Sequence, residues 1–173
     1  DKAGDEFHPD SSPDGSLIAF VFNDRGSQPD PFRSSIVVTD PDGGGWTELI
    51  TKEDESLGWP VWSPDGTRLA FVGLTDRWSI YVMDADGTDV TKVREEPRDL
   101  SGLPLSWTPD GQRIVFWGHG PDEEALLSMR PDGTGVREFI DGFPTSEFLG
   151  HLELSWSPDG QWIVMGGPAE DQG

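Results

Sequence analysis

The sequence carries four near copies of one ten-residue phrase, and this repetition constrains the fold more than any other feature. The copies begin at residues 11, 62, 107 and 156, and each contains Pro-Asp-Gly, as in WSPDGTRLAF and WSPDGQWIVM. They lie 51, 45 and 49 residues apart. A period of this size indicates that each copy belongs to one supersecondary unit that stacks on its neighbours.

Each repeat predicts four strands in two hairpins. The apolar run after each Pro-Asp-Gly, such as RLAFVG from Arg68, is rich in β-forming residues, and a shorter strand-like segment precedes the tripeptide. Pro presets φ, Asp can bond the backbone ahead of it and Gly accepts a positive φ, so the tripeptide should form a hairpin turn. Two further runs, joined by Asp-Gly turns at Asp42, Asp86 and Asp132, predict the second hairpin.

Four antiparallel strands in a unit of about 45 residues match one blade of a β-propeller. We therefore expect an all-β propeller of four-stranded antiparallel blades, in a single segment that covers residues 1–173. About three and a half repeats are present, and they fall at approximately 5–51, 57–95, 102–141 and 150–167.

The fourth repeat contains only the first two strands. Its apolar QWIVM strand would be a bare sheet edge, which invites pairing with another chain. Further blades of a longer propeller, a second copy that completes the ring as a homodimer, or strands from a partner protein could cover it.

The second repeat resembles a known propeller family. Its pattern PVWSPDGTRLAFVG, followed by SIYVMDADGTDVTKV, is similar to the TolB-type propeller repeat. The match covers nearly all of the chain and is loosest in the first repeat, where Ser11 stands at the Trp position. The resemblance implies protein partners and an extracytoplasmic bacterial location, periplasmic or secreted.

The charge of the chain limits its partners. The sequence has 33 acidic and 12 basic residues, a formal charge of −21, which disfavours nucleic acids and anionic membranes and suits cationic partners or solubility. No Cys is present, so disulfides and thiol chemistry are excluded. No apolar run reaches the length of a membrane span and no signal peptide is recognisable in this chain, so we expect no membrane insertion.

The Asp-rich second turns are weak metal candidates. Asp40 with Asp42, and Asp84 with Asp86, resemble the start of a calcium-binding loop, but neither stretch supplies the remaining ligands of an EF-hand. The third copy has Arg130 at the position of Asp84, which favours a structural turn. We expect no cofactor, with calcium as the one ion to test.

Residues outside the repeat pattern are the better candidates for partner contacts, because loops carry function on a rigid scaffold. They come from the long first loop NDRGSQPDPFRSS, from the WGHGPDEEALL segment, from the non-repeated Trp residues and from the start of the last inner strand. The candidates are Arg25, Phe32, Arg33, Trp78, His119, Glu123, Glu124 and His151.

Two sets of side chains are assigned by position. The loops between repeats should form an acidic face that attracts a basic partner, with Glu53, Asp54, Glu55, Glu95, Glu96, Asp99, Asp141 and Glu147. The tryptophans at one repeat position should pack between blades, namely Trp62, Trp107 and Trp156. The others could anchor a partner where they are exposed: Trp46, Trp59, Trp78, Trp117 and Trp162.

Catalysis finds little support in the sequence, since none of the three His residues lies near a recognisable nucleophile motif. The adjacent Glu95 and Glu96 should point apart on any regular backbone. The sequence therefore predicts a non-catalytic binding or assembly module. Two alternatives remain open: a propeller that filters substrates for a prolyl oligopeptidase-like serine peptidase, and a structural, self-assembling or calcium-binding propeller.

Overall fold

The computed structural model describes residues 4–24, 33–96, 105–120, 124–140, 153–157 and 159–166. In these residues the chain forms three four-stranded antiparallel sheets and one two-stranded sheet, which we call blades 1 to 4. This arrangement confirms the predicted fold class of about three and a half blades.

Each blade follows the order of the chain, with neighbouring strands paired antiparallel. Blade 1 contains β1 (Asp5–Ser11), β2 (Ile18–Asp24), β3 (Arg33–Thr39) and β4 (Thr47–Lys52). Blade 2 contains β5 (Ser56–Trp62), β6 (Arg68–Leu74), β7 (Trp78–Asp84) and β8 (Thr91–Glu96). Blade 3 contains β9 (Leu105–Trp107), β10 (Ile114–His119), β11 (Glu124–Met129) and β12 (Arg137–Glu138). Blade 4 contains β13 (Glu153–Trp156) and β14 (Ile163–Gly166).

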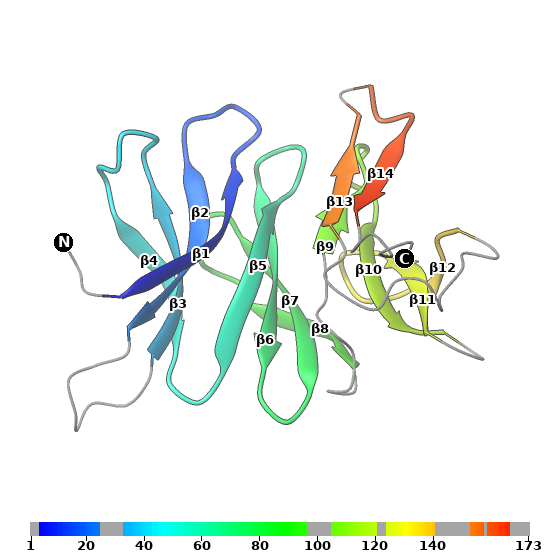
Figure 1. Ribbon diagram of the computed structural model, residues 1–173, viewed down its shortest axis with the longest axis horizontal. Helices are drawn as coiled ribbons and strands as arrows, with labels where there is room; N and C mark the ends of the chain where they lie inside the picture. Colours follow the sequence, from blue (N-terminus) through cyan, green and yellow to red (C-terminus); the bar gives the residue numbers. More distant parts are fainter. Residues whose placement is uncertain are drawn as a thin grey trace, which may run out of the picture.

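The blades stand side by side in chain order (Figure 1). Their first strands are neighbours, because β1 contacts β5, β5 contacts β9 and β9 contacts β13. The β1–β2, β3–β4 and β5–β6 turns lie at the upper end of the view, and the β4–β5 and β6–β7 connections lie at the lower end. We call the first strands the inner strands, since the first strand of each blade lines the axis in a propeller.

The repeated Pro-Asp-Gly forms the turn between the first two strands of a blade. In blade 2, Asp65 Oδ1 accepts hydrogen bonds from the Ser63 hydroxyl at 2.6 Å and from the Thr67 N–H at 3.0 Å. Gly66 has a φ of 69°, which few residues with a side chain adopt. Asp14, Asp110 and Asp159 accept equivalent bonds. The motif is therefore a turn device in every copy.

The hydrophobic core lies between blades. Trp62 belongs to a cluster that joins blades 1 and 2, and Trp107 to a cluster that joins blades 2 and 3. Trp156 of blade 4 packs partly buried against the second cluster, and its Nε1–H donates to Ser106 Oγ at 3.0 Å. The repeated tryptophans therefore pack between blades, as the sequence predicts.

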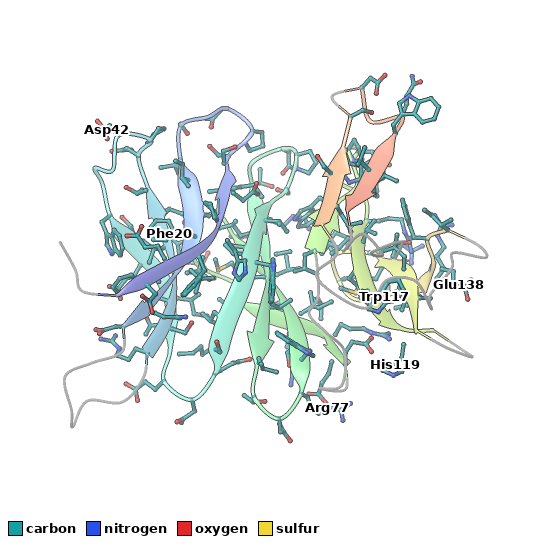
Figure 2. The ribbon with its side chains drawn as sticks, viewed as in Figure 1. Phe20, Asp42, Arg77, Trp117, His119 and Glu138 are labelled. Atoms are coloured by element: carbon teal, nitrogen blue, oxygen red, sulfur yellow. The ribbon has the colours of Figure 1, made fainter. Side chains whose placement is uncertain are left out.

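Blade 1 has a second apolar face, on the side away from blade 2. Phe20 and Phe22 lie there, and Trp46 meets both rings edge-on at centroid distances of 5.1 Å (Figure 2 labels Phe20). Phe20 is 7% exposed and Phe22 is 4% exposed, so Trp46 helps to cover this face. Val90 and Val136, which hold the position of Trp46 in the next two repeats, are 38% exposed.

The last blade has an open edge within the described residues. There β14 pairs with β13 alone, and Trp162 and Val164 beside that edge are 71% and 67% exposed. An uncovered strand of this kind can pair with a further strand. Among the residues that the structure describes, no helix is long and apolar enough to cross a membrane.

Candidate functional site

Two successive inner strands carry the same irregularity. The register of β1 with β2 shifts between Phe7 and Asp10, and that of β5 with β6 shifts between Gly58 and Val61. At these bulges His8 has a φ of 53° and Trp59 a φ of 46°, a region that few non-glycine residues enter, Asn, Asp and His more often than the others. Such a conformation costs of order 1–3 kcal/mol per residue and persists only where the surroundings hold it.

The bulges bring aromatic side chains from blades 1 and 2 together. The His8 and Trp59 rings are stacked at a centroid distance of 4.2 Å, and Trp78 meets Trp59 edge-on at 5.9 Å. Phe7 lies 6.1 Å from His8 and is 41% exposed. We call Phe7, His8, Trp59 and Trp78 the inner aromatic cluster. It presents exposed apolar surface and an imidazole on the inner strands.

Pro9 and Pro60 explain why both bulges fall at these positions. Proline has no N–H to give to a sheet ladder, so inside a strand it is confined to edges and bulges. The His-Pro and Trp-Pro pairs are therefore the sequence signal for the cluster. Trp59 and Trp78 are both predicted from sequence as possible anchors for a partner, whereas His8 and the proline pairs carry no predicted role.

The other predicted partner-binding residues are spread over the fold. Arg33 is exposed at the start of β3, and His119 is 39% exposed at the end of β10 (Figure 2). Of the predicted partner-binding residues only Trp78 belongs to the inner aromatic cluster, and Trp59, predicted separately as an anchor where exposed, is its other tryptophan. The side chain of Glu124, at the start of β11, is outside the described residues, as are Arg25, Phe32, Glu123 and His151.

The expected acidic face is only partly correct. Glu96 is 1% exposed and so does not belong to it: its carboxylate accepts the Arg94 Nε–H at 2.5 Å. Glu95 is exposed but paired, with Arg77 at 2.6 Å and Lys92 at 2.9 Å. Glu55 accepts the Tyr81 hydroxyl at 2.9 Å. Of the remaining predicted acids, Glu53 and Asp54 are exposed, and Asp99, Asp141 and Glu147 are outside the described residues.

The second Asp-Gly turns use their carboxylates to hold the backbone. Asp42 Oδ1 accepts the Gly44 N–H at 3.0 Å, and Asp86 Oδ1 accepts the Thr88 N–H at 3.0 Å and its hydroxyl at 2.6 Å. Asp40 and Asp84 close the same turns through their backbone atoms. No group of three or more His, Asp or Glu that could hold a metal ion occurs in the described part of the chain. Calcium binding at these four residues stays a prediction.

The turn carboxylates make stability depend on pH. The Ser63 hydroxyl, followed by the Thr67 N–H and hydroxyl, lowers the pKa of Asp65 to about 2. A lowered pKa stabilises the fold above the ordinary value of 3.8, and this stabilisation is lost as pH falls through the folded-state pKa. We expect Asp65→Asn to lower the melting temperature by a few degrees at about pH 5, and the difference from wild type to vanish near about pH 2.

The control for this measurement is Asp54→Asn, which removes an exposed charge outside these turns. Comparing the variants by thermal unfolding over a pH series separates the turn from the general effect of lowering a large negative charge. A difference between wild type and Asp65→Asn that stays constant from about pH 5 to about pH 2 would contradict the assignment.

Comparison with known proteins identifies the repeat. A TolB homolog of Chlorobium luteolum is 32% identical over 127 residues, 72% of this chain and 26% of that protein. Crystalline TolB from Acinetobacter baumannii superposes with a TM-score of 0.73 at 21% identity, over 97% of this chain and 39% of the other. The chain is built of TolB-like β-propeller blades. No protein-family model matches it.

The TolB-like blades also occur in relatives with other names. The uncharacterized peptidase YuxL of Bacillus subtilis is 31% identical over 148 residues, 74% of this chain and 22% of that protein. The chain thus spans about a quarter of the length of these two curated relatives. The TolB-like fold is consistent with a protein-interaction module, and proteins with these blades include one named as a peptidase.

Proposed function

We propose that this TolB-like propeller segment is a non-catalytic module that binds another protein through the inner aromatic cluster. The observation that carries the proposal is the stacked pair of His8 and Trp59. Each residue holds a left-handed backbone conformation at a bulge, His8 in β1 and Trp59 at the equivalent bulge of the neighbouring inner strand β5. Strain of this kind gathers at binding sites, where the fold is arranged to present particular side chains.

The chemistry of the cluster suits a protein partner. Aromatic side chains supply large contact areas at low cost in conformational entropy, and they dominate the binding energy of many interfaces. Phe7 and His8 are exposed. Trp59 and Trp78 are partly buried and pack against the hydrophobic cluster that joins blades 2 and 3. The resemblance to TolB supports an extracytoplasmic setting, periplasmic or secreted, for this interaction.

The test is affinity capture from an envelope extract of the source organism. We expect wild type to retain a defined partner and the double variant His8→Ala/Trp59→Ala to lose it by at least about tenfold, since such hot spots contribute about 2 kcal/mol or more each. Retention is measured by quantitative mass spectrometry of the bound fraction.

Trp162→Ala is the matched control, because Trp162 is an exposed tryptophan beside the edge of blade 4 and outside the cluster. It should leave retention unchanged. Equal retention by the wild type and the double variant would overturn the proposed surface, provided that both show the same circular dichroism.

Two other functions have specific support. The likeness to the peptidase YuxL favours a propeller that covers a catalytic domain, which a hydrolase domain encoded in the same gene would support. The open edge of β14 favours self-association, including a homodimer that completes the ring, which light scattering would show as a dimer.

A further inference from the structure

A cavity of about 420 Å³ lies where blade 2 meets blade 3. This volume is in the range of sites that hold small ligands. It opens beside the end of β8 and the last two strands of blade 3, and Figure 2 shows His119 and Glu138 on this side of the molecule. The described residues that line it include Arg94, His119, Leu127, Val136, Arg137 and Glu138.

Two residues that line the cavity, Leu127 and Arg94, depart from the pattern of the preceding repeat. Tyr81 pairs with Phe71 across β6 and β7, and Leu127 pairs with Phe116 at the same place in blade 3. Between blades 1 and 2 the Tyr81 ring stacks on Phe71 at 5.2 Å, and its hydroxyl donates to Glu55 at 2.9 Å. Leu127 is shorter and has no hydroxyl, so it does not fill the corresponding space.

The second difference between the repeats places an arginine side chain at the cavity. Ile50 on β4 pairs with Ile36, and the equivalent residue on β8, which pairs with Ile80, is Arg94. The first interface is therefore closed by an apolar residue and a tyrosine. The second interface has an arginine and a leucine at the same two positions, and both line the cavity.

Arg94 is held in place by its neighbours. Its Nε–H donates to the buried Glu96 carboxylate at 2.5 Å, and its guanidinium carbon lies 5.5 Å from the centre of the Phe116 ring. The backbone N–H of His119 donates to the other oxygen of Glu96 at 3.2 Å. Because Glu96 binds the Nε side of the guanidinium, the Nη groups are the part that can meet a ligand. This fixed fork suits a carboxylate.

The described lining of the cavity carries charges of both signs: Arg94, which is paired with Glu96, Arg137, and the carboxylate of Glu138. Arg94 and Arg137 are two of only 12 basic residues in a protein with a formal charge of −21. Glu138 is a carboxylate of the rim and disfavours ligands with several negative charges. Leu127 and the 38% exposed Val136 supply apolar wall.

We propose that this cavity binds a small carboxylate that carries an apolar group. Arg94 and Arg137 would bind the carboxylate, and Leu127 and Val136 would pack on the apolar part. A free organic acid and the C-terminus of a peptide both present this chemistry. The site is separate from the inner aromatic cluster, so it stands whether or not that cluster binds a protein.

Titration calorimetry with two matched compounds tests the charge requirement. N-acetyl-leucine should bind, and the neutral N-acetyl-leucinamide should bind at least about tenfold more weakly, since a charge-assisted pair is lost. A short peptide that ends in a free leucine carboxylate distinguishes the source. Tighter binding of the peptide than of N-acetyl-leucine supports a peptide C-terminus, and equal binding supports a free acid. Absence of binding by all three, or equal binding of the amide, overturns the proposal.

Variants place the binding in the cavity. Leu127→Tyr restores the residue of the preceding repeat and should fill the space, so it should abolish binding. Arg137→Gln removes an exposed charge and should weaken N-acetyl-leucine by about tenfold. Arg130→Gln, an exposed arginine of the same blade outside the cavity, is the control and should bind like wild type. Unchanged affinity in both Leu127→Tyr and Arg137→Gln would overturn the assignment.

Discussion

Replacing Trp107 by alanine is expected to lower the free energy of unfolding by about 3–5 kcal/mol, the range for a large aromatic side chain removed from a core. Trp107 is 4% exposed and lies in the cluster that joins blades 2 and 3. Its Nε1–H donates to the backbone oxygen of Val61 at 3.1 Å, and the Arg68 guanidinium carbon lies 5.0 Å from the centre of its ring. Alanine therefore removes packing and an inter-blade hydrogen bond together.

Urea unfolding followed by circular dichroism measures this cost as a shift in midpoint at unchanged slope. Trp162→Ala is the control, because Trp162 is 71% exposed and its loss should change stability by less than about 0.5 kcal/mol. If the two variants were equally stable, the repeated tryptophan would not be what joins the blades.

The turns and strands could be predicted because their causes are local. The Asp65 carboxylate bonds residues two positions away on either side, and Gly66 supplies the positive φ within the same turn. These interactions need no information from other blades. The number of strands then follows from counting copies of a phrase whose geometry is set within the phrase.

The inner aromatic cluster could be predicted only in part. Pro9 and Pro60 inside strand-like segments indicate a bulge from sequence. His8 and Trp59 also hold left-handed conformations, and their rings stack on one another across two blades. That contact follows from how neighbouring inner strands align, which the spacing of the repeats does not determine.

The cavity between blades 2 and 3 could also be predicted only in part from the sequence. When the third strands of the repeats are aligned, Leu127 holds the position of Tyr81, so the replacement of tyrosine by leucine is visible in the sequence. Its consequence depends on what each side chain meets at the interface with the preceding blade. Glu55 bonds Tyr81, and Arg94 lies beside Leu127 in the wall of the cavity. The structural effect of a substitution within a repeat therefore depends on the interface between repeats.

Strand alternation predicts that Glu95 and Glu96 point apart, and the structure confirms it, since Glu95 is exposed and Glu96 is buried. Which of the two is buried depends on blade 3. A Cβ atom at Gly118 would lie 3.0 Å from Glu96 Oε1 and 2.9 Å from the Phe116 ring, so a side chain there would crowd the Glu96 carboxylate. Glu96 is predicted on the acidic face because the sequence places it in a loop between repeats, whereas β8 extends to Glu96.

Glu96→Ala is accordingly expected to cost about 2–4 kcal/mol, while Glu95→Ala should cost less than about 1 kcal/mol. Removing Glu96 leaves the Arg94 guanidinium, which is 25% exposed, without its carboxylate, and leaves the His119 N–H without its acceptor. Glu95 pairs with Arg77 and Lys92 in solvent, where such pairs contribute little. The two variants remove the same side chain from adjacent positions of β8, one on its exposed face and one on its buried face.

The same variants connect stability to the cavity. Because Glu96 holds Arg94 at the wall, Glu96→Ala should also weaken N-acetyl-leucine, whereas Glu95→Ala should not. Urea midpoints give the first effect, and calorimetry well below the midpoint gives the second. If Glu96→Ala were no less stable than Glu95→Ala, the buried carboxylate would not hold blades 2 and 3 together. If Glu96→Ala were destabilised but bound the ligand as wild type does, Arg94 would be positioned by its contact with Phe116 instead.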